Sequence, residues 1–359
     1  MSAEPSDFPR PNRPAPEREL PSARSHGHSR QTAEDEQPAR PNFLIVGAAK
    51  SGTTSLFQYL RGHPEVFMPD LKEASFFAGD GIRTEAEYLG LFRGSAGKKA
   101  IGEASVAYLY LPETAPAIRA LLTPDVRVVI ILRNPVDMAY SLWGHMVREG
   151  RETLEFFDAI KAETSRMANA AFRREAKGWL YNYAYLDRAR YAQQVEVYLR
   201  TFDRAHVRVL IFEEFFADVA GGFGELCAFL GVDPEHRPMF EAFNRAGILR
   251  SRLLRKMLED PAPWKDIVKS LTPDGPRLKL KAWLSKFNHK DQPLPPLTRA
   301  QREYLWQLFA PDVARLEAVL GRRIDCWSAE PSEICARQRA EAAFQGASGA
   351  SRYDARRAY

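Results

Sequence analysis

Cysteine is scarce in this chain. The 359 residues contain three cysteines, which lie far apart as Cys227, Cys326 and Cys335. An odd number without paired spacing argues against a disulfide framework and against a cysteine-based metal site. We therefore expect a protein of the reducing cytoplasm with no bound metal.

Long apolar runs are also missing. No stretch approaches the roughly 18 apolar residues that mark a membrane-spanning helix. The amino terminus lacks the order of a charged and then an apolar segment that is typical of a secretory signal. Neither a membrane span nor secretion is expected.

Positive charge is in small excess, with a formal net charge of +5. The excess is concentrated between Ile248 and Lys290, where eleven Lys or Arg stand against four acidic residues. A solvated surface is the simplest interpretation of this segment. No recognised nucleic-acid motif or aromatic platform accompanies the charge, so no nucleic-acid partner is expected.

The composition divides the chain into three parts. Residues 1–40 hold seven of the 25 prolines and few apolar residues, which predicts a disordered leader because too little surface can be buried to offset the entropy of ordering. Residues 41–328 are expected to form a single domain without internal repeats. Residues 329–359, rich in Ala, Arg, Glu, Gly and Ser, are expected to be a peripheral tail.

Between these ends the pattern is that of an α/β protein. Apolar runs at 43–46, 126–132 and 207–212 suit strands that are buried on both faces. Helical patterns follow the first two runs, and a long helix over about 179–202 is expected before the third. This alternation predicts a three-layer fold in which helices flank a central, mainly parallel sheet. Ligands of such sheets bind at the carboxyl ends of the strands.

The segment GAAKSGTTS, from Gly47 to Ser55, directly follows the first run. It is P-loop-like without matching the nucleotide-hydrolase form, because Lys50 precedes the second glycine instead of following it. Its backbone N–H groups and the following helix amino terminus, which adds about half a positive charge, suit an anion. A helix start capped by Ser and Thr side chains is the plain structural alternative.

Two motifs together resemble a known family. KSGTT (Lys50–Thr54) after a strand is similar to the 5'-phosphosulfate loop of the sulfotransferases that depend on 3'-phosphoadenosine 5'-phosphosulfate (PAPS), and LRNPVDMAYS (Leu132–Ser141) is similar to their 3'-phosphate motif. The likeness covers roughly residues 42–328 and is strongest to bacterial and heparan-type members. It implies transfer of a sulfonate group from PAPS to a hydroxyl or amine, which leaves adenosine 3',5'-bisphosphate (PAP). A small-molecule or glycan acceptor, either a carbohydrate or a natural product, is implied as well.

The resemblance also implies roles for single residues. Lys50 would contact the 5'-phosphate and the oxygen that bridges to sulfur, where negative charge develops. The residues that would hold the 5'-phosphate with it are Ser51, Gly52, Thr53, Thr54 and Ser55. Arg133 and Ser141 would bind the 3'-phosphate, although a surface salt bridge is the alternative for Arg133.

Two glutamates are candidates for the base that takes the acceptor proton. KEASFF (Lys72–Phe77) is similar to the KE-x-x-FF motif of heparan-type members, and this makes Glu73 the first choice. Apolar neighbours such as Phe76 and Phe77 would suit such a base. A solvated Lys72–Glu73 pair beside two core phenylalanines is the alternative.

Glu103, in IGEASVAY, is the second candidate. Heparan-type members have a lysine directly after this glutamate, whereas Ala104 stands here, so that cation is absent or is supplied by Lys72. His145 is kept as an acceptor-site candidate. Arg190 and Tyr191 loosely resemble a feature that opens a helix beside the donor in relatives.

Two rival functions stay open at this point. A nucleotide-dependent kinase would need its lysine after the second glycine and acidic residues for magnesium, for which Asp137 is the candidate. A non-enzymatic module that binds polyanions through the basic segment is the other. The acceptor, the choice between O- and N-transfer and the oligomeric state are not determined by the sequence.

Overall fold

A computed structural model of the chain describes residues 40–240, 248–249, 289–290 and 294–330. The expected leader, apart from its last residue, lies outside the described residues. So do the tail beyond Glu330 and nearly all of the basic segment between Ile248 and Lys290.

The core of the molecule is a five-stranded sheet in the order β2-β3-β1-β4-β5. Its strands are β1 (Phe43–Gly47), β2 (Val66–Phe67), β3 (Ala100–Ala104), β4 (Arg127–Leu132) and β5 (Val207–Ile211). All four neighbouring pairs are parallel. Every residue of β1 and β3 is buried, as the apolar reading of the first run predicts.

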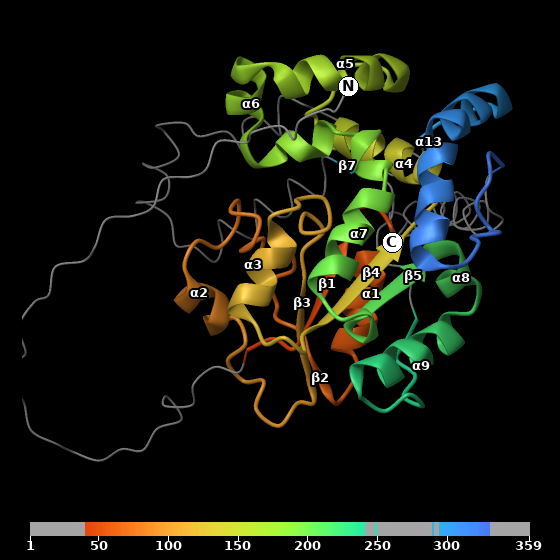
Figure 1. The fold of residues 1–359 in the computed structure, drawn as a ribbon. Coiled ribbons are helices and arrows are strands. Elements are labelled where there is room, and N and C mark those ends of the chain that lie inside the picture. The colour runs from red at the N-terminus through yellow and green to blue at the C-terminus, as the bar shows by residue number, and fades with distance from the viewer. Residues whose placement is uncertain (1–39, 241–247, 250–288, 291–293, 331–359) are drawn as a thin grey trace, which may run out of the picture. The chain divides into compact units, whose positions relative to one another are not determined.

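Helices cover both faces of this sheet (Figure 1). The α-helices are α1 (Thr53–Arg61), α2 (Glu85–Gly90), α3 (Thr114–Leu121), α4 (Pro135–Arg148), α5 (Phe156–Ala168), α6 (Ala170–Ala176), α7 (Ala192–Thr201), α8 (Phe212–Ala217), α9 (Val219–Leu230) and α13 (Arg299–Leu320). Short 3-10 turns are η1 (Lys177–Tyr183), η2 (Asp187–Ala189) and η3 (Arg204–His206), and β6 (Ile248–Leu249) pairs antiparallel with β7 (His289–Lys290). Among the described residues, no helix has the length and apolar character that a membrane crossing requires.

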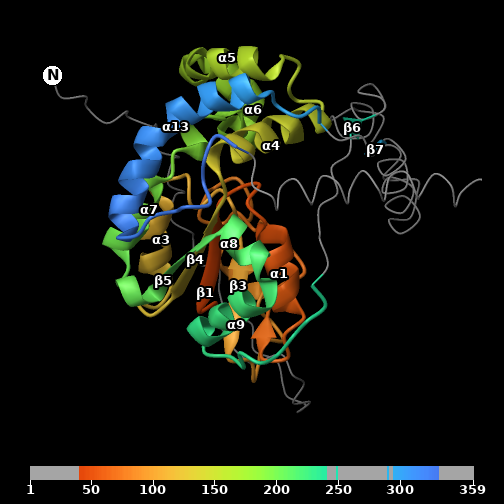
Figure 2. The same cartoon turned by 90° about the vertical axis from the view of Figure 1, so that its right-hand side faces the viewer.

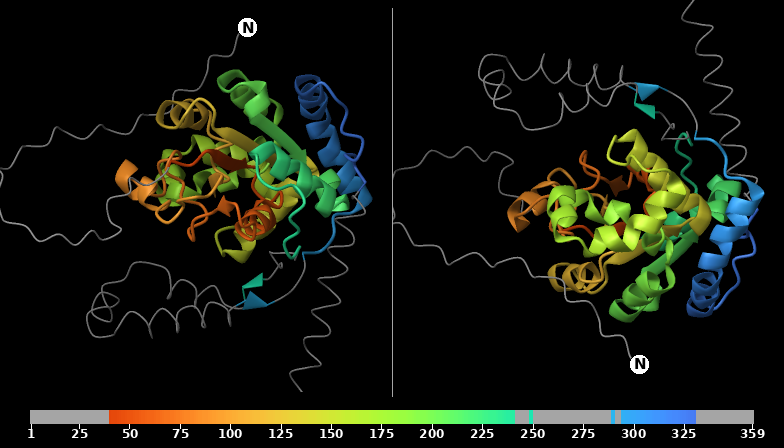
Figure 3. Two further views of the ribbon diagram at one scale, coloured as in Figure 1. Left: turned by 90° about the horizontal axis from the view of Figure 1, so that it is seen from below. Right: turned by 90° about the horizontal axis from the view of Figure 1, so that it is seen from above.

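Alternate residues of the strands feed two separate cores. Leu44 and Val46 of β1 point to the face that is covered by α3, α4, α7 and α13. Phe43 and Ile45 point to the opposite face, under α1, α8 and α9. Figures 2 and 3 show α13 alongside α7 on the first face. The expected three-layer α/β fold is therefore confirmed, because a strand buried on both faces presents successive side chains to opposite layers.

The prediction of one long helix over residues 179–202 is wrong. The chain instead forms the 3-10 turns η1 and η2 before α7 begins at Ala192. Tertiary hydrogen bonds break up the helix: the Tyr185 hydroxyl donates to Glu152 (2.9 Å), and the N–H groups of Leu186 and Asp187 donate to Glu163 (2.8 and 3.0 Å). These contacts hold the backbone out of a continuous helical path.

The sheet order brings two motif-bearing loops together. β1 and β4 are direct neighbours, with Gly47 opposite Ile130 at their carboxyl ends. The loop after β1 leads into α1, and the residues after β4 lead into α4. Both motifs thus lie at the same edge of the sheet, as expected for ligand-binding loops of parallel sheets.

Candidate active site

The loop between β1 and α1 is shaped as an anion-binding turn. The Ala48 N–H donates to the Ile131 carbonyl (2.7 Å), which ties the loop to β4. Lys50 and Gly52 both have left-handed backbone conformations, with φ of 59° and 88°. A Cβ at Gly52 would lie 2.7 Å from the ring of Phe216, so only glycine fits here.

The first turn of α1 has no side-chain cap. Gly52 is its N-cap residue, and the Leu56 N–H donates to the Gly52 carbonyl (3.1 Å). Thr53 and Ser55 are buried, whereas Thr54 is half-buried. The alternative of a Ser- or Thr-capped helix start is therefore wrong, and the uncapped N–H groups of this turn suit an anionic ligand.

The second motif adopts the helix start that its sequence suggests. Asn134 caps α4 by accepting a hydrogen bond from the Val136 N–H (3.0 Å), and Pro135 is the first helical residue. Arg133 lies between β4 and this cap, and its guanidinium stacks over the Phe212 ring at 4.9 Å. Ser141 follows two turns later on α4 and is half-buried.

Arg133 joins the two loops directly. Its Nη1 donates to the Lys50 carbonyl (3.2 Å). The Tyr191 hydroxyl donates in turn to the Arg133 carbonyl (3.0 Å) and lies beside Ser51, whose own hydroxyl donates to the Ala49 carbonyl (3.2 Å). Ser51 is fully buried, so its side chain belongs to the frame of the loop. The loose resemblance at Tyr191 thus falls on a residue that contacts both motifs.

Positive charge is concentrated around Lys50. Burial and the charges of Arg148, Arg133 and Lys72 together lower the pKa of Lys50 to about 7, against the opposing effect of Glu149. Cations that crowd together in a partly buried loop destabilise one another unless an anion joins them. The electrostatics of this loop therefore favour a multiply charged anion.

Arg148 is a residue that the motif analysis missed. It lies at the end of α4, half-buried, and burial lowers its pKa. Helical spacing was the available signal, because Ser141, His145 and Arg148 follow one another at i, i+4 and i+7 and so share one face of α4. All three are half-buried, while Leu142 and Met146 between them are buried.

Glu73 lies in a loop that is fastened to the end of β3. The Glu73 N–H donates to the Ala104 carbonyl (2.9 Å), and its Oε2 accepts a hydrogen bond from the Val106 N–H (2.8 Å). Lys72 forms an ion pair with its other carboxylate oxygen. Glu73 and Ser75 both have left-handed backbones, with φ of 62° and 50°. Such local strain is characteristic of functional loops.

The Glu73 side chain is 37% exposed and faces a cleft. The cleft has a volume of about 470 Å³ and is lined by Glu73, Ser75, Asp80, Gly81, Arg151, Glu175, Ala176, Gly178 and Trp179. Arg151 stacks over the Trp179 ring at 4.2 Å, and the His145 ring lies 6.1 Å from that ring. The structure thus places Glu73 at the wall of a pocket that is large enough for a small molecule.

Glu103 occupies a different environment. It lies on β3, between β2 and β1, is fully buried and does not line the cleft. Burial raises the pKa of Glu103 to about 7, against the opposing effect of hydrogen bonds from Tyr108 and Ser105. The Ser105 hydroxyl donates to its Oε2 (2.9 Å). Ser105 also accepts a hydrogen bond from the Ser75 N–H (3.0 Å), so Glu103 supports the loop of Glu73 from below.

The phenylalanines of the KEASFF segment belong to the core. Phe76 stacks on Tyr88 with 4.5 Å between ring centroids, and the Phe77 ring lies 5.5 Å from Tyr108. These two tyrosines are the neighbours of Glu103. Phe76 and Phe77 therefore pack against the tyrosines that neighbour Glu103.

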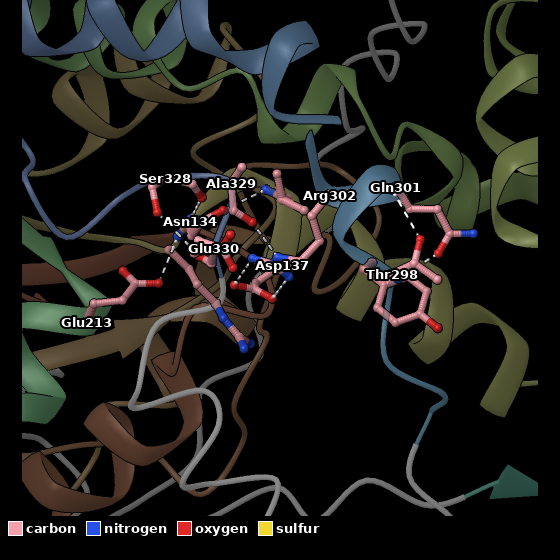
Figure 4. A network of polar contacts seen from close by, with 12 residues as sticks. Asn134, Asp137, Glu213, Thr298, Gln301, Arg302, Ser328, Ala329 and Glu330 are labelled. Carbon is pink, nitrogen blue, oxygen red and sulfur yellow. Dashed lines mark hydrogen bonds and ion pairs between the residues drawn. The ribbon is translucent and has the colours of Figure 1, made fainter. Parts of the chain in front are cut away.

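Asp137, the candidate magnesium ligand of the kinase alternative, is engaged elsewhere. Its two carboxylate oxygens pair with Nη1 and Nη2 of Arg302 on α13, at 2.9 and 3.2 Å, and both side chains are buried (Figure 4). Ser328 and Ala329 lie at the same helix start, where the Asn134 side chain donates to the Ser328 carbonyl (2.9 Å) and Arg302 donates to the Ala329 carbonyl (2.6 Å). Within the described part of the chain, no three His, Cys, Asp or Glu side chains form a group that could hold a metal.

The parallel sheet with helices on both faces and the glycine-containing turn after β1 define an α/β protein with a P-loop-like fold. A family model described as "Sulfotransferase domain" matches residues 40–246, which is more than half of the chain. The chain belongs to the sulfotransferase family. It is also similar to a solved sulfotransferase from Alicyclobacillus acidocaldarius, with 35% identity, a TM-score of 0.60 and coverage of 80% of this chain and 99% of that one.

Curated relatives agree with this assignment. Over 260 residues the chain is 28% identical to heparan sulfate glucosamine 3-O-sulfotransferase 6 of Mus musculus, which covers 70% of each protein. Over 104 residues it is 35% identical to the membrane-associated sulfotransferase kil1 of Dictyostelium discoideum, which covers 28% of this chain and 22% of that protein. The chain thus spans about a fifth of the length of the latter relative.

Proposed function

We propose that this protein transfers a sulfonate group from PAPS to a hydroxyl or amine of a small acceptor. The observation that carries the proposal is the junction of the two loops, in which Arg133 of the second donates to the Lys50 carbonyl of the first. A single nucleotide with phosphate groups at both its 5' and 3' ends would occupy both loops at once.

The residues present fit this donor. The uncapped first turn of α1 and the crowded cations around Lys50 both suit a multiply charged anion. In our assignment, main-chain N–H groups of residues 51–55 hold the 5'-phosphate, with the exposed part of Thr54 adding its hydroxyl. Arg133 and Ser141 hold the 3'-phosphate, and Arg148 adds a further cation beside Lys50.

Lys50 is assigned to the leaving group. As the bond between sulfur and the bridging oxygen breaks, negative charge grows on that oxygen, and an adjacent ammonium stabilises this state more than the ground state. The loop fixes Lys50 by its left-handed backbone and by the bond from Arg133 to its carbonyl. Lys50 therefore needs little reorganisation during the reaction.

Glu73 is assigned as the base. Its carboxylate takes the proton of the acceptor O–H or N–H while the acceptor atom forms its bond to sulfur, and PAP leaves with the former bridging oxygen. The Val106 N–H and Lys72 hold the two carboxylate oxygens, which orients the group toward the cleft. Glu103, the second candidate, is fully buried and off the cleft, so we place it as support for this loop.

The cleft suggests a compact acceptor without multiple negative charges. Its volume of about 470 Å³ suits a small molecule. Among its described side chains, Asp80, Glu175 and Glu73 are carboxylic acids and Arg151 is the single cation. Like charges disfavour a polyanion at such a site. We therefore favour a neutral sugar or another hydroxyl-bearing natural product over a sulfated or uronic acid polymer.

Transfer from radiolabelled PAPS to a panel of neutral, amine-bearing and polyanionic acceptors tests this function. We expect labelled product with compact neutral or amine-bearing acceptors, unchanged by EDTA, and PAP as coproduct. A phosphorylated product from labelled ATP with magnesium would instead support the kinase. Failure of any acceptor to receive label, while PAPS binds, would contradict the proposal in favour of a binding module.

A further inference from the structure

A buried guanidinium contacts Val106, the residue that binds the Glu73 carboxylate. Arg188 lies in η2 with 2% of its surface exposed, and it is among the largest fully buried side chains of the described protein. Burial lowers its pKa. An arginine in such a place is unfavourable unless its donors and its charge are satisfied. Its surroundings therefore indicate what it does.

The hydrogen-bond partners of Arg188 are neutral groups. Nη1 donates to the Asn182 side-chain oxygen (2.5 Å), and Nη2 donates to the Val106 carbonyl (3.1 Å). The guanidinium also lies over the rings of Tyr110 and Tyr181, at 5.7 and 5.1 Å from their centroids. These contacts fix its orientation without neutralising its charge.

Arg188 is linked to Glu73 through Val106. Val106 accepts from Arg188 with its carbonyl and donates from its N–H to Glu73 Oε2 (2.8 Å), so one residue is held between the two side chains. Burial lowers the pKa of Arg188, and Tyr181, Tyr110 and Glu73 oppose this effect. Asp80, which accepts a hydrogen bond from Tyr181, is a second carboxylate within its influence.

We propose that Arg188 is a positioning residue for Glu73: it fixes Val106, whose N–H orients the carboxylate, and it supplies a buried positive charge that balances this carboxylate from behind. The inference rests on the proposed role of Glu73 as base. Lys72, whose side chain is 19% exposed, forms an ion pair with the same carboxylate.

Arg188→Met tests the proposal because it keeps much of the side-chain volume and removes the charge and both hydrogen bonds. We expect kcat to fall about a hundredfold, in the range of a general base, with the affinity for PAP unchanged. Arg188→Lys keeps the charge and should recover about tenfold of that loss. Arg200→Met, which removes an exposed arginine from α7, is the matched control and should leave kcat unchanged.

The decisive comparison repeats Arg188→Met in a Glu73→Gln background. If Arg188 acts through Glu73, the second substitution causes little further loss of kcat. An equal loss in both backgrounds, or an unchanged kcat in the single variant, would overturn the proposal. If Arg188→Met does not fold, Asn182→Ala takes its place, because it removes the partner of Arg188 Nη1. This variant should lower kcat and leave the PAP affinity unchanged. A wild-type kcat in Asn182→Ala would count against the proposal.

The proposed function fails separately from this inference. If the wild-type protein transfers no label from PAPS, the sulfotransfer proposal fails before any variant is made. If the wild type is active and Glu73→Gln retains full turnover, the base is misassigned. If turnover depends on Glu73 but is unchanged in Arg188→Met, the inference about Arg188 fails and the proposed function stands.

Discussion

The two sides of the site carry opposite charge: one is rich in cations and the other in carboxylates. The donor side, at the ends of β1 and β4, gathers Lys50, Arg133 and Arg148 around main-chain N–H groups. The acceptor side, beyond the end of β3, presents Glu73 and Asp80, which are held in place by hydrogen bonds from Val106 and Tyr181. In the proposed function, the first side would hold the anionic donor and the second would remove the proton of the acceptor.

The proposed reaction would take place at the boundary between the two sides. Lys72 is the residue that belongs to both, because it pairs with Glu73 and its charge also lowers the pKa of Lys50. A sulfonate placed between Lys50 and Glu73 would face its leaving group on the cationic side and its nucleophile on the anionic side. Variants that remove the charged groups of one side at a time separate the roles of the two sides.

The largest effect is expected on the donor side from Lys50→Ala. Without the ammonium, the charge that develops on the bridging oxygen is not stabilised, so kcat should fall about a thousandfold. Radiolabel transfer measures this loss, and thermal unfolding tests that the fold is intact. Lys161→Ala, at an exposed position of α5, is the control. Near-normal turnover of Lys50→Ala would remove Lys50 from the reaction.

The acceptor side is broken by Glu73→Gln. The amide keeps the shape of the side chain and loses the ability to take a proton, so kcat should fall about a hundredfold. PAP affinity, measured by calorimetry, should stay at the wild-type value because the donor loops are untouched. Retained turnover would move the base away from Glu73.

Arg133→Ala should separate binding from chemistry on the donor side. Loss of a charged hydrogen-bonding partner for the 3'-phosphate should weaken PAP binding by about ten- to a hundredfold. Calorimetry with PAP gives this number directly. Arg208→Ala on β5, where the arginine pairs with exposed Glu225, is the control. An unchanged PAP affinity in Arg133→Ala would show that the 3'-phosphate lies elsewhere.

The sequence predicted the strands that precede the Lys50 and Arg133 loops better than the strands near Glu73. The strands over 43–46, 126–132 and 207–212 were recognised because they are continuous apolar runs, and the structure confirms them. β3 was not identified as a strand, because AIGEA places a glycine and a charged residue in a buried element. β2 is two residues long and leaves no periodic signal.

The side chains that sequence reasoning missed depend on contacts between distant parts of the chain. Arg188 touches Val106 across 82 positions, and η2, which carries it, was expected to be part of a long helix. Phe76 and Phe77 were adjacent to Glu73 in sequence, but their rings pack toward Tyr88 and Tyr108 beside Glu103. Local sequence motifs can identify one loop at a time. Which charged side chains lie close together depends on tertiary packing, which the motifs do not contain.

The smallest effect, and the most specific to the donor side, is a dependence of PAP binding on pH. Burial and neighbouring cations lower the pKa of Lys50 to about 7 in the free protein, and a bound anion favours its protonated form and raises that pKa. Below pH 7 Lys50 is already charged, so affinity should be nearly constant. Above pH 7 binding must take up a proton, and affinity should fall by up to about tenfold per pH unit. Calorimetry in buffers of different ionisation enthalpy measures this proton uptake. The uptake should vanish in Lys50→Ala and persist in Glu73→Gln. Proton uptake that survives in Lys50→Ala would assign the titrating group elsewhere.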